Sequence, residues 1–87
     1  MEIIGQIISG SYNEMQEEFT LNQVKHLQTT SVLKENQVNQ LYEYLEKHKD
    51  EVDGQVLSLY DQLLVRLSQE DIHKFLADLE RLRDMYE

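Results

Sequence analysis

Residues 56–67 read Val-Leu-Ser-Leu-Tyr-Asp-Gln-Leu-Leu-Val-Arg-Leu, and this stretch decides the fold that the sequence predicts. Four of its apolar residues recur at steps of four, three and four, the spacing of one helical face: Val56, Tyr60, Leu63 and Leu67. Leu57, Leu59 and Leu64 widen this stripe to nearly half of the helix circumference. A helix so broadly apolar must be covered on more than one side. The stretch therefore predicts a central helix, with Leu63 in the core, packed among the other helices.

The composition favours an all-α fold. The chain has 87 residues, no proline and three glycines, so the usual breakers of helices are nearly absent. An apolar content of 40% is enough for one modest core. We therefore predict a single helical domain over residues 1–87, a small antiparallel bundle of three to four helices with a C-terminal helical hairpin.

The first segment predicts a helix over residues 2–18. Its apolar residues continue along one helical face from Ile3 to Phe19. Gly10 and the capping residues after it fit a bend in this helix, or a break into two short helices. Because isoleucine is β-branched, a short strand over residues 2–9 is a further alternative.

Two more helices are expected before the turn formers at residues 50–54. Thr20 and Gln23 have the spacing of a capping box, which predicts a short helix of about two turns. The apolar pattern resumes at Val32 and predicts a longer helix that ends near Lys49.

The last helix is expected to begin after Ser68, which has Asp71 at the capping-box position. Its apolar residues form a seam that repeats like a heptad: Ile72, Phe75, Leu76, Leu79, Leu82 and Tyr86. Because the connection at residues 67–69 is so short, the last two helices are expected to form a tight corner or an antiparallel hairpin.

Residues 63–82, LLVRLSQEDIHKFLADLERL, resemble the C-terminal helices of the multiple-antibiotic-resistance repressor (MarR) family. In that family a long helix ends in Leu-Ser-x-Glu followed by an acidic residue, and a leucine-rich helix forms a dimerisation region. The resemblance implies dimerisation through residues near the ends of the chain. The sequence has no basic recognition helix, no wing hairpin and too few upstream residues for a winged-helix domain, so we do not assign the family.

Net charge is the strongest compositional signal. Seventeen acidic and eight basic residues give a net charge of −9, which opposes direct binding to nucleic acid or to an anionic membrane. A basic protein is the favoured partner, and keeping the chain in solution is the other interpretation of the charge. The chain has no cysteine, and its sequence shows no membrane-spanning or signal segment, so we expect a cytoplasmic protein.

The sequence predicts no catalytic, cofactor or metal site. None of His26, His48 and His73 lies in a recognisable nucleophile motif, and a glycine-rich phosphate loop is absent from the sequence. Glu70 and His73 form a single Glu-x-x-His pair, whereas a di-iron site requires two. We therefore do not expect an enzyme.

Two classes of function remain. The first is a small acidic protein that occupies the surface of a basic partner, as an inhibitor, an antitoxin or immunity protein, or a regulatory adaptor. The second is a structural or oligomerisation module, including a homodimer formed through the isoleucine-rich N-terminus and the C-terminal seam. For the first class, the predicted partner contacts are acidic clusters and their apolar neighbours: Ile4, Ile8, Glu14, Glu17, Glu18, Phe19, Asp50, Glu51 and Asp53.

Overall fold

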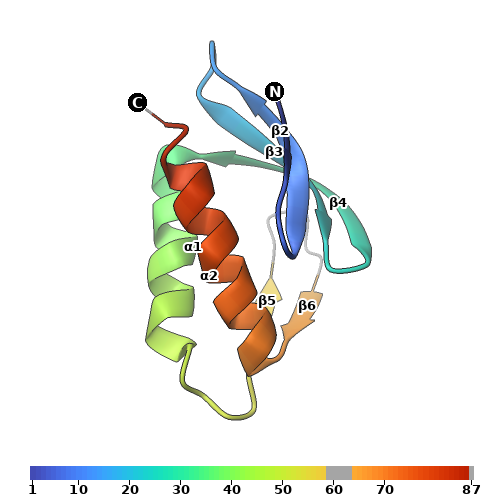
Figure 1. Ribbon diagram of the computed structural model, residues 1–87, viewed down its shortest axis with the longest axis vertical. Coiled ribbons are helices and arrows are strands. Elements are labelled where there is room, and N and C mark those ends of the chain that lie inside the picture. Colours follow the sequence, from blue (N-terminus) through green and yellow to red (C-terminus); the bar gives the residue numbers. More distant parts are fainter. Residues whose placement is uncertain (59–63, 87) are drawn as a thin grey trace.

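Residues 1–58 and 64–86 are described by a computed structural model, which is a mixed α/β structure with two antiparallel sheets (Figure 1). In chain order its elements are β1 (Glu2–Ile4), β2 (Ile8–Asn13), β3 (Glu18–Val24), β4 (Leu27–Lys34), α1 (Glu35–His48), β5 (Gln55–Ser58), β6 (Leu64–Leu67) and α2 (Gln69–Arg83). The all-α prediction is therefore wrong, both for the bundle of three to four helices and for the helical character of the domain over residues 1–87.

The first four strands form one sheet in the order β1-β2-β3-β4, in which each strand is antiparallel to the next. In β2 the buried residues are Ile8, Gly10 and Tyr12, which repeat at the period of two expected for a strand with one covered face. In β3, Phe19 and Leu21 face the same side. This alternation fixes one face of the sheet toward the core.

Two predicted helices are strands in the structure. The predicted helix over residues 2–18 is β1, β2 and the turns that follow them, so the strand alternative for residues 2–9 was closer. The predicted short helix after Thr20 is part of β3. Gly10, the predicted bend, lies within β2, where an added Cβ would come 2.7 Å from the Phe19 ring and would also collide with the β3 backbone. Glycine is needed there for close packing, and it ends no helix.

The two helices of the structure, α1 and α2, correspond to the other two predicted helices. The helix predicted from Val32 to Lys49 is α1, although its first three residues belong to β4. The capping box predicted for α2 is confirmed, because Ser68 Oγ accepts from the Asp71 amide at 3.1 Å and the Asp71 carboxylate accepts from the Ser68 amide at 3.0 Å. All six apolar residues of the predicted C-terminal seam are buried. Within the described residues, neither helix is long and apolar enough to cross a membrane.

The stretch that predicted a central helix contains β5 and β6, which pair with each other as an antiparallel hairpin. Leu57, Val65 and Leu67 are buried, so burial again repeats at a period of two. Tyr60 and Leu63, which were predicted in the core, lie outside the described residues. Because a strand and not a long helix precedes Ser68, the predicted helical hairpin and the structural basis of the MarR resemblance are both wrong.

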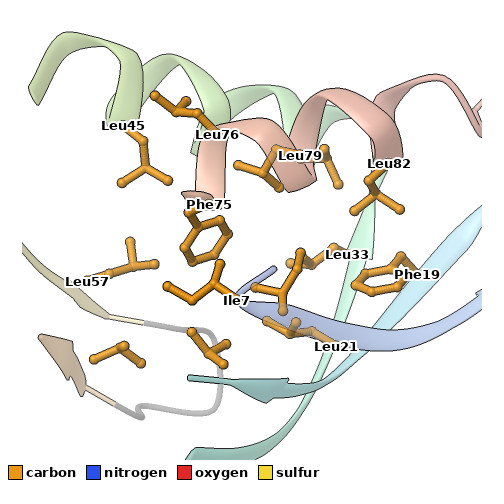
Figure 2. Close-up of a cluster of buried hydrophobic side chains, with 14 of the residues drawn as sticks. Ile7, Phe19, Leu21, Leu33, Leu45, Leu57, Phe75, Leu76, Leu79 and Leu82 are labelled. Atoms are coloured by element: carbon orange, nitrogen blue, oxygen red, sulfur yellow. The ribbon is translucent and has the colours of Figure 1, made fainter. Parts of the chain in front are cut away.

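The buried side chains of both sheets and both helices form one hydrophobic cluster. Figure 2 shows α1 and α2 on one side of this cluster and the strands on the other, with Phe75 and Leu79 of α2 directed toward Ile7, Leu21 and Leu33. The molecule thus has a helical layer and a β layer.

Candidate protein-binding surface

The side of the four-stranded sheet opposite the core carries two cross-strand rows of side chains. The strand register aligns Glu2, Ser11, Thr20 and Val32 in one row, and Ile4, Ser9, Gln23 and Gln28 in the other. Asn22 and Thr30 project on the same side. We call these ten residues the outer face. They alternate with the buried residues of the same strands, so neither α1 nor α2 covers them.

The outer face is dominated by hydroxyl and amide side chains, and it is hollowed. A shallow depression of about 540 Å³ is lined by residues of β1, β2 and β3, including Ile4, Ser11 and Asn22. A second depression of about 620 Å³ lies over β3 and β4 and shares Asn22 and Gln23 with the first. Side chains of a partner could enter these depressions and exchange hydrogen bonds with their polar walls.

The outer face also carries little charge, because Glu2 is the single charged residue among its ten. The six strands in the described part of the chain carry two acidic and two basic residues, so their charges cancel: Glu2, Glu18, Lys34 and Arg66. The net charge of −9 therefore lies in the remainder of the chain, chiefly in helices and turns. The centres of protein interfaces are depleted of charged residues, and the outer face shares this property.

The predicted acidic contact residues lie in two separate places. Glu14 and Glu17 are exposed in the β2–β3 turn, whereas Asp50, Glu51 and Asp53 are exposed in the loop between α1 and β5. Figure 1 shows this turn at the top of the long axis and this loop at the bottom, and the molecule is 39 Å long. The structure therefore does not bring the two acidic clusters together.

The apolar contact residues predicted beside the acids divide into one exposed and two buried side chains. Ile4 is 71% exposed and belongs to the outer face. Ile8 and Phe19 are 3% and 0% exposed and lie in the core, so a partner cannot touch them in the folded chain. Glu18 is half-buried, with a carboxylate oxygen 3.8 Å from Lys34 Nζ. The predicted N-terminal helix, along which these residues were expected to lie, is replaced by strands.

Glu51 is engaged within the chain. Its carboxylate accepts a hydrogen bond from His48 Nδ1 at 2.6 Å and another from Gln55, whose amide oxygen accepts from Tyr44 Oη at 2.9 Å. The hydrogen bond from His48 is the main reason that the pKa of the Glu51 carboxyl lies below its ordinary value. This network fixes the loop to the end of α1. The exposed carboxylates of Asp50 and Asp53 are the ones that the loop offers to a partner.

The apolar surface predicted for a homodimer is largely used inside the chain. Leu82 and Tyr86 are buried and Met85 is half-buried. Tyr86 Oη donates to the Leu33 carbonyl oxygen at 2.7 Å, and its ring meets the Tyr12 ring edge to face at 5.1 Å. The C-terminal seam therefore closes the core beneath β2 and β4 and is not free to pair with a second copy.

Most of the outer face was not predicted from the sequence. Its signal is alternation: in Ser9-Gly10-Ser11-Tyr12-Asn13 every second residue is small and polar, as expected for a strand with one exposed face. Burial also alternates in the β5–β6 hairpin, where exposed Val56 precedes buried Leu57 and exposed Leu64 precedes buried Val65. Both segments repeat every two residues, but their apolar residues were assigned to helical faces from the sequence.

Within the described residues, no three histidine, aspartate or glutamate side chains are close enough together to hold a metal ion. No model of a known protein family, no curated protein and no solved structure matches this chain.

Proposed function

We propose that this chain acts by binding another protein through the outer face, and that the partner is basic. The observation that carries the proposal is the segregation of charge: the uncovered outer face has almost no charge, while the rest of the molecule is strongly acidic. A binding face of this kind does not repel a partner, and the acidic surroundings select a partner of opposite charge.

The contact energy would come from few residues. Ile4 is the most exposed apolar side chain of the outer face, and Val32 lies in the neighbouring row with 45% exposure. Around them, the hydroxyl and amide groups would form direct or water-mediated hydrogen bonds with the partner. Because the face is mainly polar, it suits a partner that associates and dissociates rather than a permanent subunit.

Such a binding protein could serve as an inhibitor, an antitoxin or immunity protein, or a regulatory adaptor. No enzymatic activity is part of the proposal. The cytoplasm is the proposed compartment, because a chain without cysteine has no need of an oxidising environment.

The test is a comparison of two arginine variants. A tagged chain is used to purify its stoichiometric partner, and the affinity of the purified pair is measured by calorimetry. Asn22→Arg places a long cation on the outer face, and Gln40→Arg places the same side chain at an exposed position on α1. We expect Asn22→Arg to weaken binding at least tenfold and Gln40→Arg to leave it nearly unchanged.

Equal affinities of these two variants would contradict the proposal, as would recovery of an acidic partner. Both variants replace exposed polar residues, so thermal unfolding should be close to that of the parent. That measurement separates a lost contact from a lost fold.

A further inference from the structure

Among the described residues, β1 pairs with β2 alone, so it forms one edge of the four-stranded sheet. In an antiparallel pair, every second residue exchanges hydrogen bonds with the neighbouring strand, and the residues between them direct their backbone groups away from it. Met1 and Tyr12 exchange both bonds, at 2.7 and 2.9 Å, and Gly5 donates to Ile8 at 2.8 Å. Met1, Ile3 and Gly5 therefore direct their backbone N–H and C=O groups toward β2.

It follows that Glu2 and Ile4 direct their N–H and C=O groups to the open edge of the sheet. Within the described residues, these four backbone groups have no hydrogen-bond partner in the protein. The side chains of the same two residues belong to the outer face and line its depression of about 540 Å³. The edge of β1 and the outer face are thus one continuous surface.

We propose that an extended, basic segment of the partner protein adds to β1 as a further strand of the sheet. This inference rests on the proposed function and names how the partner is held. Addition of a strand to an open edge is a common way of recognising extended peptides, because the backbone supplies hydrogen bonds and alternate side chains supply specificity. Here the backbone groups of Glu2 and Ile4 provide the hydrogen bonds.

Charge argues for a basic segment and against a second copy of this chain. Glu2 is the single charged residue of β1, and an added strand would place one side chain directly beside it. A lysine or arginine there would form an ion pair. A second copy would bring together two molecules that each carry a net charge of −9, with a glutamate from each β1 strand on the same face.

The length of β1 explains why the edge and the outer face must act together. A strand of three residues offers few hydrogen bonds, and short edge strands are one way in which proteins avoid unwanted pairing. A partner that also fills the depression beside Ile4, Ser9 and Ser11 gains contacts that a chance strand would lack. The outer face would then supply specificity, and the edge of β1 would set the orientation of the partner segment.

The experiment compares two substitutions of Ile4, measured with the partner purified as described above. Ile4→Pro removes the outward N–H, and proline is tolerated in an edge strand where the N–H has no internal partner. Ile4→Ala removes the exposed side chain but keeps the N–H. We expect Ile4→Pro to weaken binding at least tenfold more than Ile4→Ala does.

A second measurement does not depend on any substitution. Amide hydrogen exchange of the parent chain should show that the Ile4 amide becomes slower by at least tenfold when the partner binds, because a new hydrogen bond protects it. If Ile4→Pro fails to fold, this readout still decides the question.

Three outcomes would overturn the inference. Equal losses for Ile4→Pro and Ile4→Ala, or an Ile4 amide that exchanges unchanged in the complex, would exclude strand addition. A dimer mass for the chain alone that Ile4→Pro returns to a monomer would show that a second copy occupies the edge. Failure of the proposed function looks different, because Asn22→Arg would then bind as well as Gln40→Arg.

Discussion

Oδ2 of Asp78, on α2, lies 2.8 Å from the backbone nitrogen of Ile7 in the turn between β1 and β2. The same carboxylate accepts from the backbone amides of Gln6 at 2.8 Å and Ile8 at 3.1 Å. Asp78 is only 4% exposed, and an added Cβ on Gly5 would lie 2.5 Å from its carboxyl group. A buried negative charge is thus compensated by three N–H donors. The contact fixes the first hairpin, and with it the open edge of β1, onto the helical layer.

Replacing Asp78 by alanine should therefore be strongly destabilising. Asp78→Ala leaves three backbone donors without their acceptor, two of them in buried hydrogen bonds, and we expect the free energy of unfolding to fall by about 3 kcal/mol or more. Asp84→Ala removes an exposed carboxylate from the end of the same helix and should cost less than about 1 kcal/mol. Urea denaturation measures both, and similar losses would show that the turn does not depend on this carboxylate.

The core between the layers gives a second prediction. Leu79 is fully buried on α2, so Leu79→Ala should lower the free energy of unfolding by about 2–5 kcal/mol. Leu64 is 64% exposed on β6, and Leu64→Ala should change the free energy of unfolding by less than about 1 kcal/mol. Equal effects would contradict the placement of the β5–β6 hairpin. The corresponding test at Leu63, suggested by the sequence, concerns a residue outside the described part of the chain.

Tyr86 predicts sensitivity to alkaline pH. Burial is the main cause that raises the pKa of its phenol above the ordinary value of 10.0, so the folded chain keeps the proton when the unfolded chain has begun to lose it. Its contribution to stability is constant below about pH 10 and decreases as the pH rises above that value. Tyr86→Phe should therefore lose less stability than the parent as the pH rises from about 10 to about 11.

Urea midpoints at a series of pH values test this expectation. At pH 7, Tyr86→Phe should be less stable by about 1 kcal/mol, because the hydrogen bond to the Leu33 carbonyl is lost. The assignment to Tyr86 fails if Tyr86→Phe keeps the full alkaline decline of the parent.

The two helices could be predicted from the sequence because helix caps and helical spacing of apolar residues are patterns that strands do not produce. The reciprocal cap between Ser68 and Asp71 and the spacing of Phe75, Leu79 and Leu82 fit a period of 3.6 and do not fit a period of two. At the N-terminus the apolar residues lie four apart, as in Ile8 and Tyr12, and a step of four is compatible with both periods. Spacing alone could not decide there.

The missed strands carry a different signal, which is residue type. β4 contains Thr29, Thr30 and Val32, whose β-branched side chains favour strands. Val65 was a second signal, because this apolar residue lies outside the apolar stripe of the expected central helix, yet it is completely buried in β6. The outer face could not be predicted because it depends on long-range pairing of strands, which the local pattern does not reveal. Of the residues predicted to contact a partner, Ile4 lies on that face, and its role in binding stays a prediction.

The last prediction concerns the two acidic ends. Glu14→Gln with Glu17→Gln removes two charges from the β2–β3 turn, and Asp50→Asn with Asp53→Asn removes two from the α1–β5 loop. If the outer face receives a basic partner, either pair should slow association with the purified partner several-fold and leave dissociation nearly unchanged. Because the molecule is 39 Å long and the Debye length at 0.1 M salt is about 10 Å, the two ends should act independently.

Independence makes the effects on the logarithm of the association rate additive, so the fourfold variant should show their sum. The control is Glu43→Gln with Asp84→Asn, which removes two exposed charges from the helical side and changes the net charge by the same amount. Raising the salt to 1 M, where the Debye length is about 3 Å, should bring all variants to one association rate. If the control slows association as much as the other two pairs, net charge alone attracts the partner and the acidic ends have no directing role. An association rate indifferent to salt would remove electrostatic attraction altogether, and the charge would then serve only to keep the protein in solution.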